Sequence, residues 1–258
     1  MMASLHQKKP HWLVLAGTEQ ARNFISYWQK QSPVMMTASL AGVTKTPPSY
    51  GVPTRTGGFS TADQNGKDGL ADYIKDHGIT AIIDFTHPFA HQISAHARYA
   101  ADRAQVLYCQ YMRPAWQAGP DDDWHYHDSW PALFGGVQTE TLFLAGGHEA
   151  LQHLPELRPY QVVARMIEAP KKARDDVTIL LSRPSADVAD EIACFTSHDI
   201  TALAVKDSGG AAGEAKLSAA RFLNVPVHMV KRPDYPAGWF SDISEMNAYL
   251  HDYLNHDH

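Results

Sequence analysis

The stretch from Ile79 to Ala90 (ITAIIDFTHPFA) constrains the fold of this chain more than any other segment. It begins with a short apolar run rich in β-branched residues, which is typical of a strand buried on both faces of a parallel sheet. Pro88 cannot continue a hydrogen-bonded ladder, so the strand must end near Thr86, and a helical pattern starts near Phe89. Polar residues therefore gather at the carboxyl end of the strand, the edge where open α/β sheets bind ligands.

The order of strand, turn and helix recurs along the chain. Buried-strand runs occupy residues 12–16, 34–40, 79–83, 106–110, 141–145, 160–165, 177–181, 200–205 and 225–230. Helical patterns separate most of these runs, and an amphipathic helix is expected over 241–254. The alternation predicts parallel sheets with helices on both faces. We place a domain boundary where the composition shifts, near 129–136.

The fold class predicted from this pattern is α/β, with two Rossmann-like domains of residues 1–135 and 136–258. The active site is expected in the cleft between the domains. Residues 46–67 are expected to form a long loop, and residues 121–126 a surface connector. An exchange of one strand between the two halves at their junction is compatible with this order.

Charge and cysteine usage exclude several classes of protein. A formal net charge of −6 argues against a nucleic-acid or membrane-surface binder, because both need a basic face. No apolar run approaches the ~20 residues of a membrane span, and the first residues carry no signal-peptide pattern. Cys109 and Cys194 are expected to be buried, reduced thiols in a cytoplasmic protein, and no metal site is expected. A monomer is the working expectation for the subunit count.

The first half carries candidate cofactor-binding residues at the ends of its predicted strands. Gly17-Thr18 joins a strand to a helix, which makes an anion site, although only one glycine of the dinucleotide fingerprint is present. Thr44 and Lys45 follow the second strand, where a doubly wound fold meets the adenosine ribose; they could equally be plain loop residues. Arg55 lies beside paired glycines and either binds an anion or is an ordinary exposed loop arginine.

The second half offers groups suited to binding carboxylates. Arg113 and Arg165 stand at the carboxyl ends of predicted strands, where the planar guanidinium suits a carboxylate. Arg113 could instead simply cover Trp116. The stretch Ile200–Lys216 has the same order of elements as Ile79–Ala90. An apolar strand is followed by Lys206 and then by a loop that offers a hydroxyl group and glycine backbone N–H groups at a helix N-terminus.

Taken together, these segments resemble the precorrin-6A reductase family, NAD(P)H-dependent enzymes of the corrin pathway to cobalamin. No single motif is decisive, but their order and spacing are specific. The matching residues are Gly17-Thr18 with Ala21-Arg22, Ser39-Leu40-Ala41-Gly42, Arg55 with Gly57-Gly58-Phe59, Asp84 with Thr86-His87-Pro88-Phe89-Ala90, Arg113-Pro114 with Trp116, Lys206 with Ser208-Gly209-Gly210, Ala215-Lys216, Ala219-Ala220-Arg221 and Arg232-Pro233.

The resemblance implies a cofactor on the first domain, the macrocycle in the cleft, and hydride delivery to a ring double bond of precorrin-6A, or its cobalt form, to give precorrin-6B. The cofactor-binding residues would be Gly17, Thr18, Arg22, Gly42, Thr44, Lys45, Arg55, Thr86, His87 and Pro88. The substrate-binding residues would be Arg113, Arg165, Lys206, Ser208, Gly209, Gly210 and Lys216. Lys206 and His87 are the candidate catalytic residues, each with a purely structural alternative, and water is a further candidate proton donor.

Three departures from the family pattern bear on these expectations. Ala16 replaces the first glycine of the Gly-Gly-Thr opening, and Gln20 replaces the glutamate that usually follows it. Val43 replaces an arginine that suits a 2′-phosphate, so NADPH is expected over NADH only if Lys45 or Arg55 substitutes for it. Asp207 stands where the family usually has asparagine.

Two rival functions can be compared with this expectation. A short-chain dehydrogenase normally needs a tyrosine and a lysine four residues apart on one helix, and no tyrosine here has a lysine four residues later. A non-catalytic nucleotide sensor or tetrapyrrole carrier could use the same fold, because a fold does not fix a function. Such a protein would have no use for two basic, glycine-containing loops facing each other.

Overall fold

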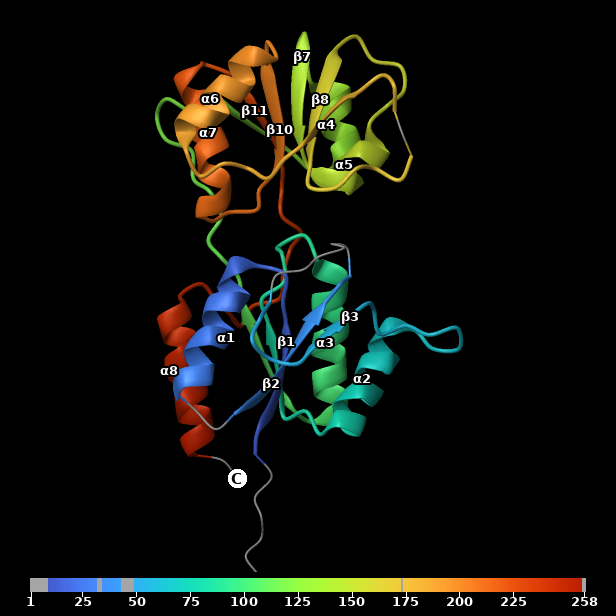
Figure 1. Ribbon diagram of the computed structural model, residues 1–258, viewed down its shortest axis with the longest axis vertical. Coiled ribbons are helices and arrows are strands. Elements are labelled where there is room, and N and C mark those ends of the chain that lie inside the picture. Colours follow the sequence, from blue (N-terminus) through green and yellow to red (C-terminus); the bar gives the residue numbers. More distant parts are fainter. Residues whose placement is uncertain (1–8, 32–33, 43–48, 173, 257–258) are drawn as a thin grey trace, which may run out of the picture. The chain divides into compact units, whose positions relative to one another are not determined.

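The computed structural model describes residues 9–31, 34–42, 49–172 and 174–256. The chain divides into two compact units, the first formed by Met1–Arg113 with Asp234–His258 and the second by Pro114–Pro233. Each unit contains a six-stranded sheet, and every strand pairing in both sheets is parallel (Figure 1). The predicted fold class of two Rossmann-like α/β units is therefore confirmed.

The predicted boundary at 135/136 differs from these units. The chain passes to the second unit after Arg113 and returns to the first at Asp234. The reason is the pairing of two short edge strands. β6 (Trp124–His127), expected as a surface connector, pairs with β11 of the second sheet, whereas β12 (Trp239–Phe240) pairs with β5 of the first. Each sheet thus takes its sixth strand from a segment next to a crossing between the units.

The first sheet has the strand order β12-β5-β4-β1-β2-β3. Its other strands are β1 (His11–Leu15), β2 (Met35–Leu40), β3 (Thr54–Thr56), β4 (Ala81–Asp84) and β5 (Leu107–Tyr111). Its helices are α1 (Glu19–Gln31), α2 (Gly66–His77), α3 (His91–Ala104) and α8 (Ile243–Asn255). The order changes direction between β1 and β4, which makes their carboxyl ends the switch point of this sheet.

Two apolar layers hold the first sheet. On one face α1 and α8 pack on the strands, and Trp12 and Trp28 meet edge to face at 4.7 Å (Figure 1). The indole of Trp28 donates to Asn247 Oδ1 at 2.9 Å, so α1 is tied to the C-terminal helix. On the other face, α2 and α3 cover residues such as Leu13 and Ile82.

Helix α2 is capped at both of its ends. Gly78 has φ 59° and ψ 38°, the left-handed conformation that glycine adopts without strain, and it ends α2. At the other end of α2, the Asn65 side chain accepts from the backbone N–H groups of Lys67 and Asp68. The Asn65 side chain thereby fixes the start of α2 at Gly66.

The second sheet has the order β6-β11-β10-β7-β8-β9. Its other strands are β7 (Thr141–Ala145), β8 (Gln161–Met166), β9 (Thr178–Leu181), β10 (Ala202–Lys206) and β11 (Val227–Val230). Its helices are α4 (Trp130–Gly136), α5 (Gly147–His153), α6 (Val188–Ser197), the 3-10 turn η1 (Ala211–Gly213) and α7 (Glu214–Phe222). The switch point here lies between β7 and β10.

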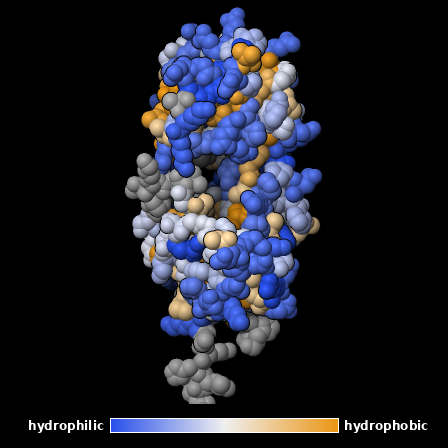
Figure 2. Space-filling view, turned by 90° about the vertical axis from the view of Figure 1, so that its right-hand side faces the viewer, coloured by the Kyte–Doolittle hydropathy of each residue, from blue (hydrophilic) through white to orange (hydrophobic). Residues whose placement is uncertain are grey.

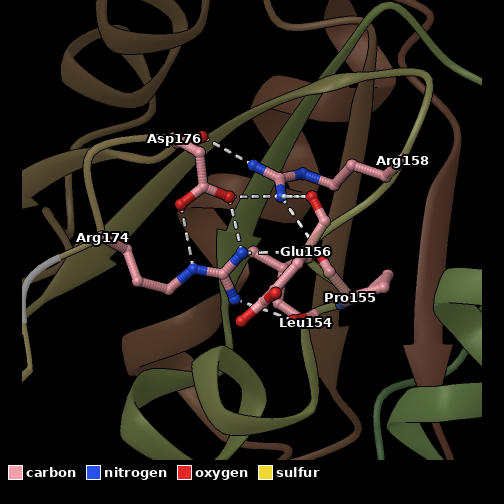
Figure 3. A network of polar contacts seen from close by, with 6 residues as sticks. All are labelled: Leu154, Pro155, Glu156, Arg158, Arg174 and Asp176. Atoms are coloured by element: carbon pink, nitrogen blue, oxygen red, sulfur yellow. Dashed lines mark hydrogen bonds and ion pairs between the residues drawn. The ribbon is translucent and has the colours of Figure 1, made fainter.

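A polar network fixes the loops that lead into β8 and β9 (Figure 3). Asp176 accepts from Arg158 Nη1 at 2.6 Å and from Arg174 Nε at 3.0 Å. Hydrogen bonds from Arg174, then from Arg158, hold the pKa of Asp176 well below its usual range. The Arg158 side chain is 95% buried by these contacts, so the network is structural.

The surface drawn in Figure 2 is largely hydrophilic over both units, and hydrophobic residues occur on it only in small patches. Among the described residues, none of the helices combines the length and the apolar character needed to cross a bilayer.

Candidate functional site

The turn after β1 stands at the switch point of the first sheet. Gly17 has φ 121°, and a Cβ added there would meet no atom within 4 Å, so the turn is open on that side. Thr18 Oγ1 donates to the Phe85 carbonyl at 2.9 Å and accepts from Ala21 N at 3.3 Å. One hydroxyl thus caps α1 and ties the β1 turn to the end of β4.

The loop after β4 is braced by a buried carboxylate. Asp84 is fully buried, and it accepts from Thr86 N at 2.8 Å and from the Tyr108 hydroxyl at 2.7 Å. Burial first, and the Asp84 charge second, raise the pKa of Tyr108, so this hydroxyl remains a donor. Asp84 therefore braces the loop that follows β4.

His87 and Pro88 sit on this braced loop. His87 Nδ1 accepts from Phe89 N at 3.2 Å, so a neutral ring carries its proton on Nε2. The Thr86 hydroxyl lies 3.1 Å from Ser94 Oγ in α3. The Pro88 carbonyl accepts from the Tyr235 hydroxyl at 2.9 Å, which ties the loop to the returning C-terminal segment.

Arg55 lies in the edge strand β3, whose register pairs it with Ser39 near the carboxyl end of β2. Its Nη1 donates to Ser39 Oγ at 2.8 Å, its Nη2 donates to the Gly58 carbonyl at 2.8 Å, and the guanidinium stacks 3.8 Å from the Phe59 ring centroid. Burial lowers the pKa of Arg55, opposed by Tyr73. Within the expected loop of residues 46–67, residues 54–56 form the edge strand β3, from which Arg55 contacts Ser39 of β2.

Two of the remaining cofactor candidates, Gly42 and Arg22, lie in the described part of the first unit. Gly42 has φ 77°, and a Cβ there would stand 3.3 Å from Gly57 N, so the ends of the two strands approach closely. Arg22 is half-buried on α1. Thr44 and Lys45 lie outside the described residues.

An ion pair spans the switch point of the second sheet. Lys206, the last residue of β10, pairs through Nζ with Glu149 Oε2 in the first turn of α5. The Lys206 side chain is 16% exposed and that of Glu149 is 52% exposed. We did not predict Glu149 from the sequence. The sequence feature that points to this position is the Gly146-Gly147 pair. It joins β7 to α5 in the same way that Gly17-Thr18 joins β1 to α1.

The loop after Lys206 makes two unusual backbone turns. Gly209 has φ 64° and Gly210 has φ 78°, and Ser208 N donates to the Lys206 carbonyl at 2.7 Å. The Gly210 carbonyl accepts from the Trp116 indole at 3.1 Å. Trp116 therefore holds this loop within the second unit, because it belongs to the segment with which that unit begins.

Asp207 and Lys216 flank this loop. Asp207 is buried, and burial raises the pKa of its carboxyl against the lowering effect of Arg232. Lys216 is buried on α7, and a Cβ added at Gly213 would stand 3.4 Å from its Nζ. Both charged groups thus lie beneath the loop rather than on an open surface.

The expectation that Arg165 binds a substrate carboxylate does not fit the structure. Arg165 Nη1 donates to both carboxylate oxygens of Glu191 at 2.7 Å, and Nη2 donates to Cys194 Sγ at 3.3 Å. The two side chains are 8% and 1% exposed. The guanidinium is neutralised by a buried partner, so it serves the packing of β8 on α6. Arg113 instead ends the first unit, directly after β5 and Met112.

The two cysteines lie in different units of the protein. Cys109 and Cys194 are free thiols, the first buried and the second only half-buried. Burial raises the pKa of Cys109 to about 12, which makes it a poor nucleophile. Within the part of the chain that the structure describes, His, Cys, Asp and Glu side chains form no group of three or more able to hold a metal ion.

The structure thus gathers Gly17, Thr18, Thr86 and His87 at one sheet edge, with Arg55 beside them, and Lys206, Ser208, Gly209 and Gly210 at the edge of the other sheet. Doubly wound parallel sheets with glycine-containing turns at their switch points define the class of Rossmann-like α/β proteins. Within that class, the sequence profile of the family described as precorrin-6x reductase CbiJ/CobK matches residues 11–251, and the chain belongs to this family.

Similar proteins agree with this assignment. A protein of Rhodococcus erythropolis called precorrin-6A reductase is 36% identical over 229 residues, covering 87% of this chain and 90% of its own. A cobalt-precorrin-6A reductase of Methanothermobacter thermautotrophicus is 28% identical, covering 88% and 78%. A solved structure described as CobK precorrin-6A reductase superimposes with a TM-score of 0.86 at 31% identity, covering 95% and 97%.

The resemblance identified from the sequence is therefore confirmed. As a member of this family the chain is an oxidoreductase that reduces the precorrin-6 macrocycle in cobalamin biosynthesis. A reductase family implies a nicotinamide cofactor. The alternative of a non-catalytic sensor or carrier is not retained.

Proposed function

We propose that this chain reduces metal-free precorrin-6A to precorrin-6B with NADPH, and that each unit supplies one half of the binding machinery. The relative of Rhodococcus erythropolis named for the metal-free substrate is 36% identical, whereas that of Methanothermobacter thermautotrophicus named for the cobalt form is 28% identical. This difference favours the metal-free macrocycle. The observation that carries the choice of NADPH is the position of Arg55.

The residues around the first switch point fit a dinucleotide. A Cβ at Gly17 would stand in open space, so a pyrophosphate can approach the backbone there. Thr18 fixes this turn through its bond to Phe85, and Asp84 fixes the neighbouring loop. Thr86, His87 and Pro88 would face the nicotinamide side, and Arg22 and Gly42 the phosphate and ribose side. When bound, the reduced nicotinamide supplies a hydride.

Arg55 is the group that fits the 2′-phosphate of NADPH. It lies in β3, which pairs with the last residues of β2, and in a doubly wound fold the carboxyl end of the second strand meets the adenosine ribose. Its contacts with Ser39 and Gly58 aim a guanidinium that can form a bidentate pair with phosphate. Arg55 would thus take the role of the family arginine that Val43 replaces.

The second unit would bind the carboxylates of the macrocycle. Lys206 is the cationic anchor, and Ser208, Gly209 and Gly210 offer hydroxyl and backbone donors at the loop before α7. Lys216 on α7 and Arg113 after β5 are further cationic candidates for carboxylate binding. His87 would contribute a polar N–H through Nε2 near the reacting carbon. Lys206 and His87 remain the proposed catalytic pair.

Titration of the purified protein with NADPH and NADH separately tests the cofactor assignment. We expect Arg55→Ala to weaken NADPH about 10- to 100-fold, the value of one or two charge-assisted hydrogen bonds, while NADH changes by less than about twofold. Lys45→Ala is measured beside it, and Lys30→Ala on the exposed side of α1 is the matched control. An equal loss for both cofactors in Arg55→Ala would remove the 2′-phosphate assignment.

A further inference from the structure

Arg232 is a partly buried arginine to which the proposed function gives no role. It lies two residues after β11, and its side chain is 14% exposed. Its Nε donates to the backbone carbonyl of Asp207 at 2.7 Å, and its Nη2 donates to the carbonyl of Pro114 at 3.0 Å. The same Nε lies 3.7 Å from Asp207 Oδ2. One guanidinium therefore bridges the backbones of two segments far apart in the sequence.

Gly209 shows how tightly these segments meet. A Cβ built on it would stand 2.0 Å from the Pro114 carbonyl oxygen and 2.3 Å from Arg232 Nη2. Its φ of 64° also disfavours any side chain. The absence of a side chain at this position is what allows the guanidinium to reach Pro114.

Trp116 makes a second connection between the same segments. Its backbone N–H donates to Asp207 Oδ1 at 3.4 Å, and its indole N–H donates to the Gly210 carbonyl at 3.1 Å. The loop from Lys206 to Gly210 is thus held at its second and its last residue. The holding groups belong to the first residues of the second unit, Pro114 and Trp116, and to Arg232 close to its last residue, Pro233.

We propose that Arg232 is a positioning residue for the substrate loop Lys206–Gly210, and that it acts by clasping this loop to Pro114. This inference rests on the proposed function, in which the loop binds substrate carboxylates. Two successive residues with positive φ leave the loop many alternative paths when nothing holds it. The Arg232 bridge selects one path, so the N–H donors and the Lys206 ammonium keep the spacing that a polycarboxylate requires.

Steady-state kinetics with precorrin-6A and NADPH test the proposal in Arg232→Met, Arg232→Lys and the neighbouring control Lys231→Met. Lys231 is exposed and pairs with Asp128, away from the loop. We expect Arg232→Met to raise KM for precorrin-6A at least about tenfold, the effect of losing one charge-assisted contact to a binding loop, with Kd for NADPH within about twofold. Lys231→Met should leave both constants unchanged. Arg232→Lys, which retains one of the two donors, should give an intermediate KM and provides the test if Arg232→Met does not fold.

Two further measurements separate positioning from general stability. Guanidinium ion at low millimolar concentration should partly restore KM in Arg232→Met, because it can occupy the vacated bridge. Gly209→Ala should raise KM to a similar degree, and the double variant should be no worse than either single variant, because both changes break one clasp. The proposal would be overturned if the KM effects of Arg232→Met and Gly209→Ala added up in the double variant and guanidinium ion did not lower KM in Arg232→Met.

A variant in the loop itself distinguishes failure of this inference from failure of the proposed function. If Lys206→Met raises KM and Arg232→Met does not, the loop binds substrate and the positioning role is refuted. If neither variant changes KM, the substrate loop is wrongly assigned and the proposal fails with it. An equal loss of NADPH and precorrin-6A affinity in Arg232→Met would mean a general structural role and would also overturn it.

Discussion

At the scale of single residues, pairing decides which charged groups remain available for ligands. Arg165 and Lys206 both stand in the last part of a parallel strand, and the sequence gives no reason to separate them. The structure pairs Arg165 with a carboxylate that is 1% exposed, whereas the carboxylate that meets Lys206 is 52% exposed. A buried partner cannot leave without a large desolvation cost, but an exposed one can exchange for a substrate carboxylate.

Glu149 should therefore compete with substrate for Lys206. We expect Glu149→Gln to lower KM for precorrin-6A about two- to fivefold, since a partly exposed ion pair contributes up to about 1 kcal/mol. The kcat should change less than KM. Initial-rate measurements over a range of precorrin-6A concentrations check this, with Glu140→Gln, an exposed glutamate before β7, as the control. A KM that rises in Glu149→Gln would show that the carboxylate positions Lys206 instead.

At the scale of elements, the segments not predicted as strands are the short edges of the two sheets. β3, β6 and β12 have the sequences TRT, WHYH and WF, without the apolar runs of the central strands. Edge strands face solvent on one side and need no continuous hydrophobic run, so periodicity does not identify these three, whereas the edge strand β9 (Thr178–Leu181) has an apolar run and was predicted. The edge strand β6 accordingly contains two histidines, His125 and His127. Their ring centroids lie 5.0 and 5.2 Å, respectively, from that of His228.

This histidine group should make the edge of the second sheet sensitive to acid. Burial, and then His125 and His127, lower the pKa of His228 to about 4, and burial also lowers the pKa of His127. The unfolded chain binds a proton near pH 6.5, so stability is present above that pH and is lost as the pH falls toward about 4. We expect a loss of about 1–2 kcal/mol between pH 7.5 and pH 5 after allowance for solvent screening.

Urea unfolding at pH 7.5 and pH 5.0 measures this loss. In His228→Leu the difference between the two pH values should shrink, whereas the exposed control His91→Asn should keep the wild-type difference. An unchanged pH difference in His228→Leu would exclude this ring as its source.

At the scale of the whole molecule, the first unit depends on the last part of the chain. Met246 and Leu250 of α8 are fully buried in the same apolar cluster as Trp12 and Trp28 of the N-terminal region. The predicted boundary assigned α8 to the second domain because a continuous reading of the sequence assumes that neighbouring segments share a domain. The pairing of β12 with β5 shows that this assumption does not hold here, because a C-terminal segment completes the first sheet.

Leu250→Ala should consequently destabilise the N-terminal region of the chain. We expect a loss of about 2–5 kcal/mol, typical of a leucine truncated in a packed core. Hydrogen exchange followed by mass spectrometry should show faster exchange in peptides of β1, β2 and β4, with peptides of β7 and β10 unchanged. Asp252→Ala, an exposed change on the same helix, is the control. Faster exchange confined to the second unit would contradict the division of the chain.

The sequence by itself determined the α/β class, the nine strands that contain apolar runs, and the glycine and polar residues that follow many of them. It could do so because buried parallel strands and helix ends depend on local apolar runs, prolines and glycines. Only the tertiary structure decided which sheet takes each edge strand, that Glu149 meets Lys206, that Arg165 is already paired, and that Arg232 reaches Pro114. These facts join residues distant along the chain, and such contacts are fixed by packing rather than by local preference.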